Sequence, residues 1–515
     1  MSQNLGFVGT VKSYPKTFWV SNVMEIFERM AWYGFFALST LYITGSVDDG
    51  CLGFSSEDRG MLQGVVSFFV YLLPFLFGAL GDRYGYKKML LIAYCVLSPT
   101  YFLLGQFKSL PGFFAIFMAV GIGAAMFKPL IVSSIGKTTD KKNSSMGFGI
   151  FYAMVNIGGL MGPFIGAAIR SGGWDKIFIA SSIWITINIP ILLIFYKEPT
   201  AEAASKAKRS LKKVMSDMFE VLGNPRFFVM IFVLLFILVV GKKVFNIQVM
   251  FSLAGVWLAG NIILDIVFKA FGTPREWRMR AGNTRFLLFL LLLSSFWVSF
   301  NQIFMTLPEY IRDFTDSKSL METLTAFFQG TFGSGAAEWF QYMFVEKDGT
   351  IKPEQVININ AFCIIFCQIF ISYIVARLKP LVTIILGVII TAVSFTLLVF
   401  GVNPILVMLG VVVFSFGEMF ASPKAKEYTA HAVAPPDKVG LYMGYYMWCN
   451  ALGALFGGLL SGELYGWLAR DLQKPELMWL FFGFLALVCA VLLFGYHRII
   501  GRKVEQENLA KAQQA

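Results

Sequence analysis

Long apolar blocks, separated by short polar segments, recur along the chain from residue 17 to residue 497. An α-helix rises about 1.5 Å per residue, so about 20 apolar residues cross the roughly 30 Å of hydrocarbon in a bilayer. The blocks predict fourteen spanning helices, at 17–44, 61–81, 88–106, 112–134, 146–170, 176–196, 228–246, 248–270, 285–306, 355–378, 381–401, 404–423, 439–467 and 476–497. The weakest division is the one at Gly241, Lys242 and Lys243, which alone interrupt a long apolar stretch.

The order of the blocks indicates two related halves. Six spans are followed by a basic segment, two further spans, a second basic segment and six more spans. Such an arrangement is typical of two-repeat transporters, whose substrate site lies between the halves near the membrane midplane. The predicted fold is an all-α polytopic membrane protein with two six-helix bundles and an inserted two-helix hairpin. The expected divisions are 1–199, 200–284 with the cytoplasmic linkers and the hairpin, 285–500, and a tail at 501–515.

Composition and charge agree with this class. The chain has 515 residues, of which 57% are hydrophobic and 14% charged, too few charges for a soluble domain of this size. Lys and Arg concentrate in the segments that are cytoplasmic if the N-terminus lies inside, so the net charge of +12 is interpreted as a topology signal and not as nucleic-acid binding. We expect a multi-pass protein of the plasma membrane, or the inner membrane of a bacterium, with both termini cytoplasmic. The span 17–44 contains charges and is too long for a cleaved signal peptide.

The first span carries three charges within five positions, Glu25, Glu28 and Arg29, in the stretch EIFERMAWYG. Spacings of three and four residues place them on one broad helix face, which must avoid lipid because an unpaired charge costs several kcal/mol in hydrocarbon. Partners at similar depth are Lys128 in 112–134 and Glu418 in 404–423. Three carboxylates against two cations leave one excess negative charge, so one Glu is expected to take up a proton.

The loop after the second span carries a recognisable motif. GALGDRYGYKKML, from Gly78 to Leu90, resembles the signature of the major facilitator superfamily. Gly78 and Gly85 permit close helix approach and a tight turn, while Asp82 and Arg83 can bond to neighbouring helix ends and hold the halves in one state. The loop is predicted to gate the conformational change.

Motifs in both halves resemble the proton-dependent oligopeptide transporters of that superfamily. These are EIFERMAWYG at 25–34, FKP at 127–129, FYAMVNIG at 151–158, FWVSFNQ at 296–302 and EMFASP at 418–423. The resemblance implies a proton-driven symporter of di- and tripeptides that works by alternating access, with Glu25, Glu28, Arg29 and Glu418 in proton coupling. It also implies a Lys128–Glu418 pair that ties the halves together near the substrate.

Further residues are expected around the substrate. Tyr33 stands beside the charged motif, Ser422 belongs to the EMFASP motif, and Tyr71 and Trp297 are aromatic residues that either pack or contact substrate. Asn156 is either a helix-packing hydrogen bond or a substrate contact.

Two positions depart from the family pattern. Phe36 stands where the family has an Arg, and Asn301 stands where it has a Glu. Losing both avoids leaving either charge buried alone, but it removes a guanidinium that could bind a peptide carboxylate. Lys128 could still bind the carboxylate as a point charge. The alternative function is therefore a proton-coupled transporter of another solute, such as a sugar, a modified peptide or an exported drug.

Other features narrow the function. Enzyme chemistry is not expected, since the chain lacks a nucleophile–base pair and a metal-ligand cluster; no cofactor is expected beyond the coupling proton. Membrane lipid and a small-molecule substrate are the expected partners, and the chain is expected to act as a monomer. In the outer segment 307–354, apolar residues at 320, 324, 327 and 328 predict a short amphipathic helix at the membrane surface.

Overall fold

Helices account for nearly all of the regular structure in a computed structural model of the chain. The structure describes residues 7–140, 143–199, 223–244, 247–274, 278–279, 282–434 and 439–501. Most of the predicted basic linker, from 200 to 222, and the predicted tail from 502 onward lie outside these residues.

The first half contains the helices up to residue 195. In chain order they are α1 (Phe7–Ser13), α2 (Lys16–Thr44), the 3-10 turn η1 (Val47–Asp49), α3 (Ser56–Leu72), α4 (Pro74–Tyr84), α5 (Tyr86–Leu104), α6 (Leu110–Lys137), α7 (Ser144–Arg170) and α8 (Asp175–Phe195).

The inserted helices and the second half follow. The insertion consists of α10 (Pro225–Val244) and α11 (Ile247–Ala270). The second half contains α12 (Thr284–Phe300), α13 (Gln302–Met305), α14 (Leu307–Phe314), α15 (Lys318–Phe332), α16 (Ser334–Phe344), α17 (Pro353–Val375), α18 (Pro380–Leu398), α19 (Pro404–Tyr428), η3 (Thr429–Val433), α20 (Val439–Leu464), η4 (Tyr465–Asp471), α21 (Pro475–Tyr496) and η5 (His497–Gly501).

Each of the fourteen predicted spans coincides with a helix or a pair of consecutive helices. Within the described residues, ten helices are long and apolar enough to cross a membrane, and the pair α3–α4, bent by 41°, makes an eleventh. The remaining predicted spans are α2, which carries the buried charges, and α10 and α20. The bend has a local cause, because Pro74 begins α4 directly after Leu73 and cannot donate a backbone hydrogen bond.

Each half has its own apolar core. One core joins α2, α3, α5, α6 and α8, and the other joins α12, α18, α19, α20 and α21. The halves meet along two seams, where α3 packs on α20 and α7 packs on α17. Two seams between two separately packed bundles are the arrangement in which one half can rock against the other.

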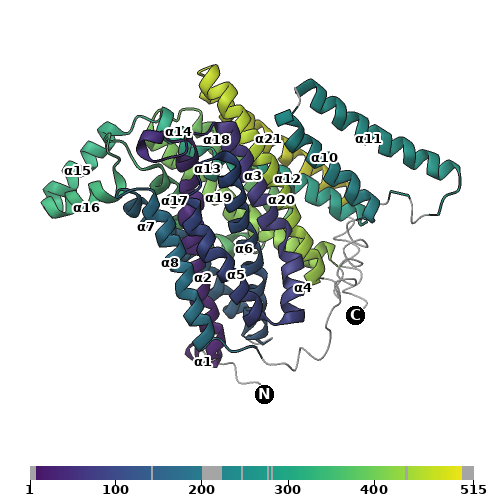
Figure 1. The fold of residues 1–515 in the computed structure, drawn as a ribbon, viewed down its shortest axis with the longest axis horizontal. Coiled ribbons are helices and arrows are strands. Elements are labelled where there is room, and N and C mark those ends of the chain that lie inside the picture. The colour runs from purple at the N-terminus through teal and green to yellow at the C-terminus, as the bar shows by residue number, and fades with distance from the viewer. Residues whose placement is uncertain are drawn as a thin grey trace.

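The insertions leave the bundle on opposite flanks. Figure 1 shows α15 and α16 projecting at the left and the hairpin of α10 and α11 standing at the right. The helix predicted at residues 320–328 is confirmed by α15, its place at the membrane surface stays a prediction, and α14 and α16 were not predicted.

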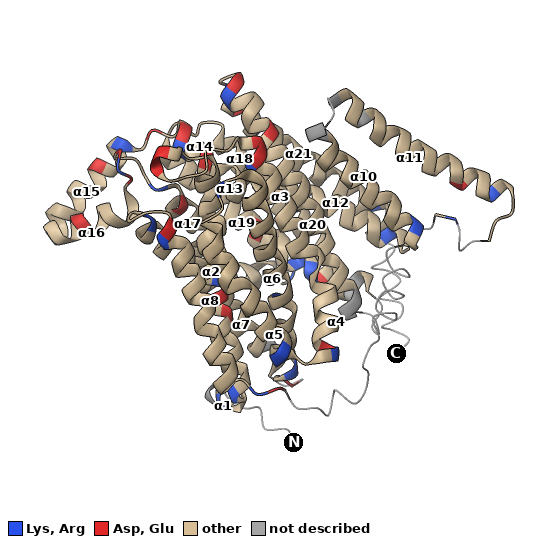
Figure 2. Ribbon diagram, in the orientation of Figure 1, with Lys and Arg blue, Asp and Glu red and all other residues tan. Residues whose placement is uncertain are grey.

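Charged residues gather at the two ends of the helix bundle, and the helices between them are largely uncharged (Figure 2). The end that carries η1 and 307–352, predicted to face outward, is called the outer end below; the opposite end is the inner end. A small number of charges remains in the middle of the bundle, and these build the site described next.

Candidate functional site

Three charged side chains of α2 form a buried cluster in the first half. Arg29 Nε donates a 2.6 Å hydrogen bond to Glu28 Oε2 and lies 3.5 Å from Glu25 Oε1. Glu25 and Glu28 are fully buried, and Arg29 is 8% exposed. The charges therefore lie together and away from lipid, as their spacing along the helix predicts.

The cluster is closed on one side by α7. A Cβ atom at Gly158 would lie 2.6 Å from Arg29 Cβ and 2.7 Å from the carbonyl oxygen of Ile26. Only glycine permits this approach, which brings the α7 backbone against the charged part of α2 and keeps lipid away from it.

Lys128 of α6 joins this cluster. Its Nζ donates a hydrogen bond to Glu25 Oε1, and its side chain is 33% exposed. Each carboxylate keeps one buried oxygen, Glu25 Oε2 and Glu28 Oε1, without a hydrogen-bond donor in the described part of the chain. A proton can add to either oxygen without displacing Arg29 or Lys128.

Glu418 of α19 is held differently in the second half. Its Oε2 accepts a 2.9 Å hydrogen bond from Asn360 Nδ2 of α17, a neutral amide that also bonds Ser415 Oγ at 3.1 Å. The expected contact between Lys128 and Glu418 is not formed in this structure, because Lys128 is bonded to Glu25 instead. A pairing of Lys128 with Glu418 would require another conformational state.

Tyrosines connect the two groups of charges. Arg29 lies 5.5 Å from the ring centroid of Tyr33, a cation–π contact. Tyr33, Tyr71 of α3 and Tyr152 of α7 each interact electrostatically with Glu418 across the two halves. We call Glu25, Glu28, Arg29, Lys128 and Glu418, with these three tyrosines, the central cluster.

The two positions that depart from the family pattern are uncharged and held by local contacts. The Phe36 ring stacks on Trp32 with centroids 5.2 Å apart. Asn301 Nδ2 donates a 2.6 Å hydrogen bond to the Trp297 carbonyl oxygen at the end of α12. The Trp297 ring is buried and contacts Phe300, with centroids 4.6 Å apart.

Two other predicted residues have mainly local surroundings. Asn156 Nδ2 donates a 2.9 Å hydrogen bond to the Tyr152 carbonyl oxygen on its own helix, one turn away. Ser422 is half-buried one turn beyond Glu418 on α19. Contact with substrate stays a prediction for both residues.

The gating motif forms the turn between α4 and α5. Gly85 adopts a φ of 92°, a conformation that favours glycine, and Glu198 accepts hydrogen bonds of 2.6 and 3.0 Å from the next two backbone N–H groups. Asp82 accepts from Tyr86 Oη and, at 3.2 Å, from Lys137 Nζ at the end of α6. Arg83 lies 5.2 Å from the Tyr84 ring, and Gly78 faces Pro129 of α6.

Sequence reasoning missed a buried network that joins the halves at the outer end. Arg59 of α3 is fully buried; its Nε lies 3.0 Å from Glu309 Oε2 of α14, and its Nη1 donates to Ser461 Oγ at 2.7 Å. Arg470 Nη2 also donates to Glu309, at 2.8 Å. The predicted span began at residue 61 and so placed Arg59 in a loop. The helix begins at Ser56, and a predicted span with that start would have placed Arg59 inside a membrane helix.

A second unpredicted network joins the halves beside α7. Arg170, at the end of α7, bonds Glu354 of α17 at 2.7 Å and also pairs with Glu346. Lys352 Nζ donates to the Ala167 carbonyl oxygen at 3.0 Å, and Tyr342 Oη donates to the Ala168 carbonyl oxygen at 3.0 Å. Both networks close the outer end of the interface between the halves.

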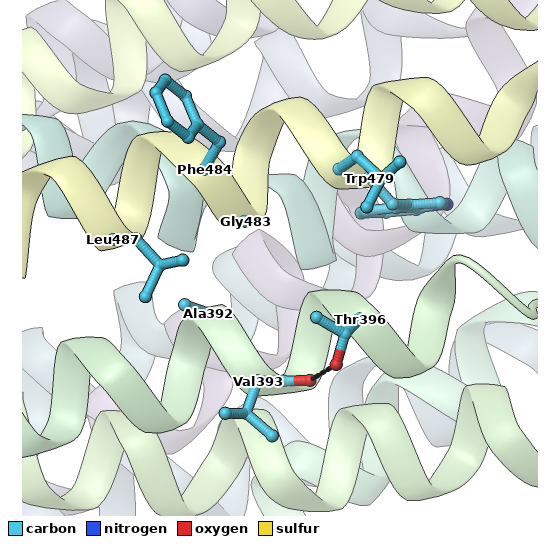
Figure 3. A pocket seen from close by; sticks show the side chains of 8 residues that line it. Ala392, Val393, Thr396, Trp479, Gly483, Phe484 and Leu487 are labelled. Atoms are coloured by element: carbon cyan, nitrogen blue, oxygen red, sulfur yellow. Dashed lines mark hydrogen bonds between the residues drawn. The ribbon is translucent and has the colours of Figure 1, made fainter.

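A groove between α18 and α21 contains no residue of the central cluster; Figure 3 shows the side chains that line it. It is lined by Ala392, Val393, Thr396, Trp479, Leu480, Gly483, Phe484 and Leu487. Thr396 Oγ1 donates a 2.7 Å hydrogen bond to the Val393 carbonyl oxygen. The groove is therefore lined by apolar groups and carries no charged side chain. It does not fit a charged substrate.

Comparison with known proteins decides the family. The family model of the Major Facilitator Superfamily matches residues 23–345 and 351–514, which is most of the chain. The chain belongs to the Major Facilitator Superfamily. It is therefore a multi-pass membrane transporter and not an enzyme.

Similar proteins include named peptide transporters. The chain is 24% identical over 479 residues to the peptide transporter YePEPT of Yersinia enterocolitica, covering 85% of this chain and 86% of that protein. It is 27% identical over 185 residues to dipeptide and tripeptide permease B of Aliivibrio fischeri, covering 35% and 36% of the two chains.

Solved structures share the fold. A peptide transporter POT in complex with sulfate has a TM-score of 0.67 and 18% identity, with 97% of each chain covered. A POT family transporter in complex with 5-aminolevulinic acid has a TM-score of 0.68 and 18% identity, covering 95% of this chain and 99% of that one. The resemblance to the proton-dependent oligopeptide transporters, predicted from the motifs, is confirmed by these comparisons.

Proposed function

We propose that this superfamily member is a proton-coupled symporter that takes up di- and tripeptides, or peptide-like solutes, by alternating access. The peptide transporters among its relatives support the substrate class. The proposal takes the chain to work as a monomer in the plasma membrane, with cytoplasmic termini and no cofactor besides the coupling proton.

The observation that carries the proposal is the pair of buried carboxylates on α2. Glu25 and Glu28 share Arg29, Glu25 also pairs with Lys128, and each glutamate keeps one oxygen without a donor among the described residues. Burying ionised carboxylates is costly unless every oxygen is satisfied, so the balance between the protonated and ionised forms responds to the conformation around them. Such a response links proton uptake to the exchange between states.

Glu418 supplies the complementary feature for substrate. Its bonded partner is the neutral amide of Asn360, and the positive end of a zwitterionic peptide would neutralise its charge. The three tyrosines of the central cluster interact electrostatically with it from the other half.

A second solute class is favoured by one observation. Phe36 and Asn301 are uncharged, so this part of the site has no guanidinium for a carboxylate. The same fold is also found in the nucleoside transporter NupG, with a TM-score of 0.62 and 13% identity, which shows that the fold is compatible with other substrates.

Transport by the purified protein in liposomes tests the proposal. With an inward proton gradient we expect accumulation of a labelled dipeptide, loss of that accumulation with a protonophore, and competition by unlabelled di- and tripeptides. Competition by sugars or nucleosides but not by peptides would establish the alternative solute class. Dipeptide accumulation that is unchanged by the protonophore would contradict proton coupling.

A further inference from the structure

Two lysines near the inner end of α19 differ in their surroundings. Lys424 is 5% exposed and pairs with Glu427 at 2.9 Å. Lys426 is exposed, and no acidic side chain among the described residues forms an ion pair with it. Lys426 is therefore a charged group that has no carboxylate partner among the described residues.

Lys426 faces the central cluster. It interacts electrostatically with Glu418 on its own helix, with Lys128 on α6 of the other half, and with Cys449 on α20. Because these three neighbours come from both halves of the molecule, Lys426 lies near the interface between the halves.

The other cations of the central cluster are already engaged. Arg29 is shared by Glu28 and Glu25, and Lys128, which the sequence offered as a carboxylate partner, is bonded to Glu25. Phe36 and Asn301 add no charge. Lys426 is thus the one cation facing this cluster, within the part of the chain that the structure describes, that has no carboxylate of its own.

We propose that Lys426 binds the carboxylate of the substrate while Glu418 binds its amino group; the inference rests on the proposed peptide transport. Eight residues separate the two positions, which places their Cα atoms about 12 Å apart along the helix. An extended chain of two or three residues spans at most roughly 7–11 Å. A glutamate and a lysine side chain that reach inward can hold the two ends of such a peptide.

Paired binding measurements test the assignment. Affinities of a free dipeptide and of its C-terminal amide are measured with the purified protein, with Lys426→Gln, with the conservative Lys426→Arg, and with Lys424→Gln as the matched control. We expect Lys426→Gln to weaken free-dipeptide binding about tenfold to one-hundredfold, the range for a charge-assisted hydrogen bond, and to leave amide binding unchanged. Lys426→Arg should keep most of the affinity for the free dipeptide, and Lys424→Gln should preserve the preference for the free form.

The outcomes separate this inference from the proposed function. If the parent protein binds the free dipeptide and its amide equally well, or if Lys426→Gln weakens both ligands equally, peptide transport stands and the role of Lys426 is wrong. If the parent binds neither ligand, the proposed function fails and the assignment fails with it. An unchanged affinity of Lys426→Gln for the free dipeptide would also overturn the assignment.

Discussion

In each of the two glutamates of α2, the two carboxylate oxygens have different surroundings. Each is fully buried, each uses one oxygen to bond a cation, and each keeps the other oxygen without a donor in the described part of the structure. A purely structural ion pair is stabilised by satisfying all of its oxygens. The unsatisfied oxygens are the reason why we propose these two groups for proton exchange.

Neutralising either glutamate should uncouple transport from the proton gradient. Glu25→Gln and Glu28→Gln keep the size of the side chain and remove the titrating group, so we expect accumulation against a gradient to be lost while substrate exchange is retained at least in part. Uptake and counterflow in proteoliposomes measure the two activities. Glu322→Gln, on the exposed face of α15, is the control and should accumulate substrate like the parent. A glutamine variant that still concentrates substrate would show that its glutamate is not an essential coupling group.

The partner of Lys128 can be identified by two double-mutant cycles. One combines Lys128→Ala with Glu25→Gln, and the other combines Lys128→Ala with Glu418→Gln. Removing one member of a buried pair costs roughly 3–5 kcal/mol, and removing both costs less, so contacting residues couple by about 0.5–3 kcal/mol. In thermal unfolding we expect coupling with Glu25, the contact seen here, and near additivity with Glu418. Strong coupling with Glu418 alone would mean that another state dominates in solution.

At the scale of elements, hydropathy predicted the spans well because the preference of a segment for lipid depends only on the residues of that segment. It failed where a helix carries charges whose partners are distant in sequence. Residues 56–60, the start of α3, include Glu57, Asp58 and Arg59, which lower the local hydropathy, and only Glu309 from the other half explains why Arg59 is buried. No window along the sequence contains both residues.

The same limit applies to the site. The shared face of Glu25, Glu28 and Arg29 followed from spacing on one helix. Packing of four helices decides whether Lys128 pairs with Glu25 or with Glu418. The same packing brings Asn360 to Glu418. The outer segment was predicted as one surface helix because the apolar positions of α16 are interrupted by Glu338 and Gln341.

The seam between α3 and α20 depends on glycines in both helices. A Cβ atom at Gly60 would lie 2.3 Å from the Gly458 carbonyl oxygen, and one at Gly458 would lie 2.5 Å from Gly64 Cα. We therefore expect Gly60→Ala and Gly458→Ala to push the helices apart, to lower stability by about 1–3 kcal/mol and to slow transport. Gly330→Ala, in open space on α15, should change neither. Parent-like melting and transport of both seam variants would contradict this packing.

At the scale of the whole molecule, the polar contacts between the two halves lie at one end. In the described residues, the hydrogen bonds and ion pairs between the halves involve the outer ends of α2, α3, α7, α14, α17 and α20 together with the outer segment. These contacts close the outer end, and with the orientation predicted from the Lys and Arg distribution the conformation corresponds to the inward-facing state of an alternating-access cycle.

Breaking the Arg59 network should loosen that closure. Arg59→Ala removes the ion pair with Glu309 and the hydrogen bonds to Ser461 and Met305, so we expect faster hydrogen–deuterium exchange at the outer ends of α3 and α14. The matched variant Arg226→Ala breaks a 3.5 Å pair with Asp265 inside the inserted hairpin and should leave that exchange unchanged. Protection that survives Arg59→Ala would show that the Arg170 network alone holds the outer end.

The two insertions lie over the two seams. Leu235 and Val239 of α10 pack on a cluster formed by Phe68 and Leu72 of α3 with residues of α20, while Phe344, at the end of α16, packs against Phe164 of α7. Halves that rock against each other strain these seams in every cycle, and acyl chains from the surrounding bilayer are the nearest molecules able to enter a gap. The α10 helix places protein where a lipid tail would otherwise lie against the α3–α20 seam, so under the proposed alternating access it would shield that seam sideways while the halves move.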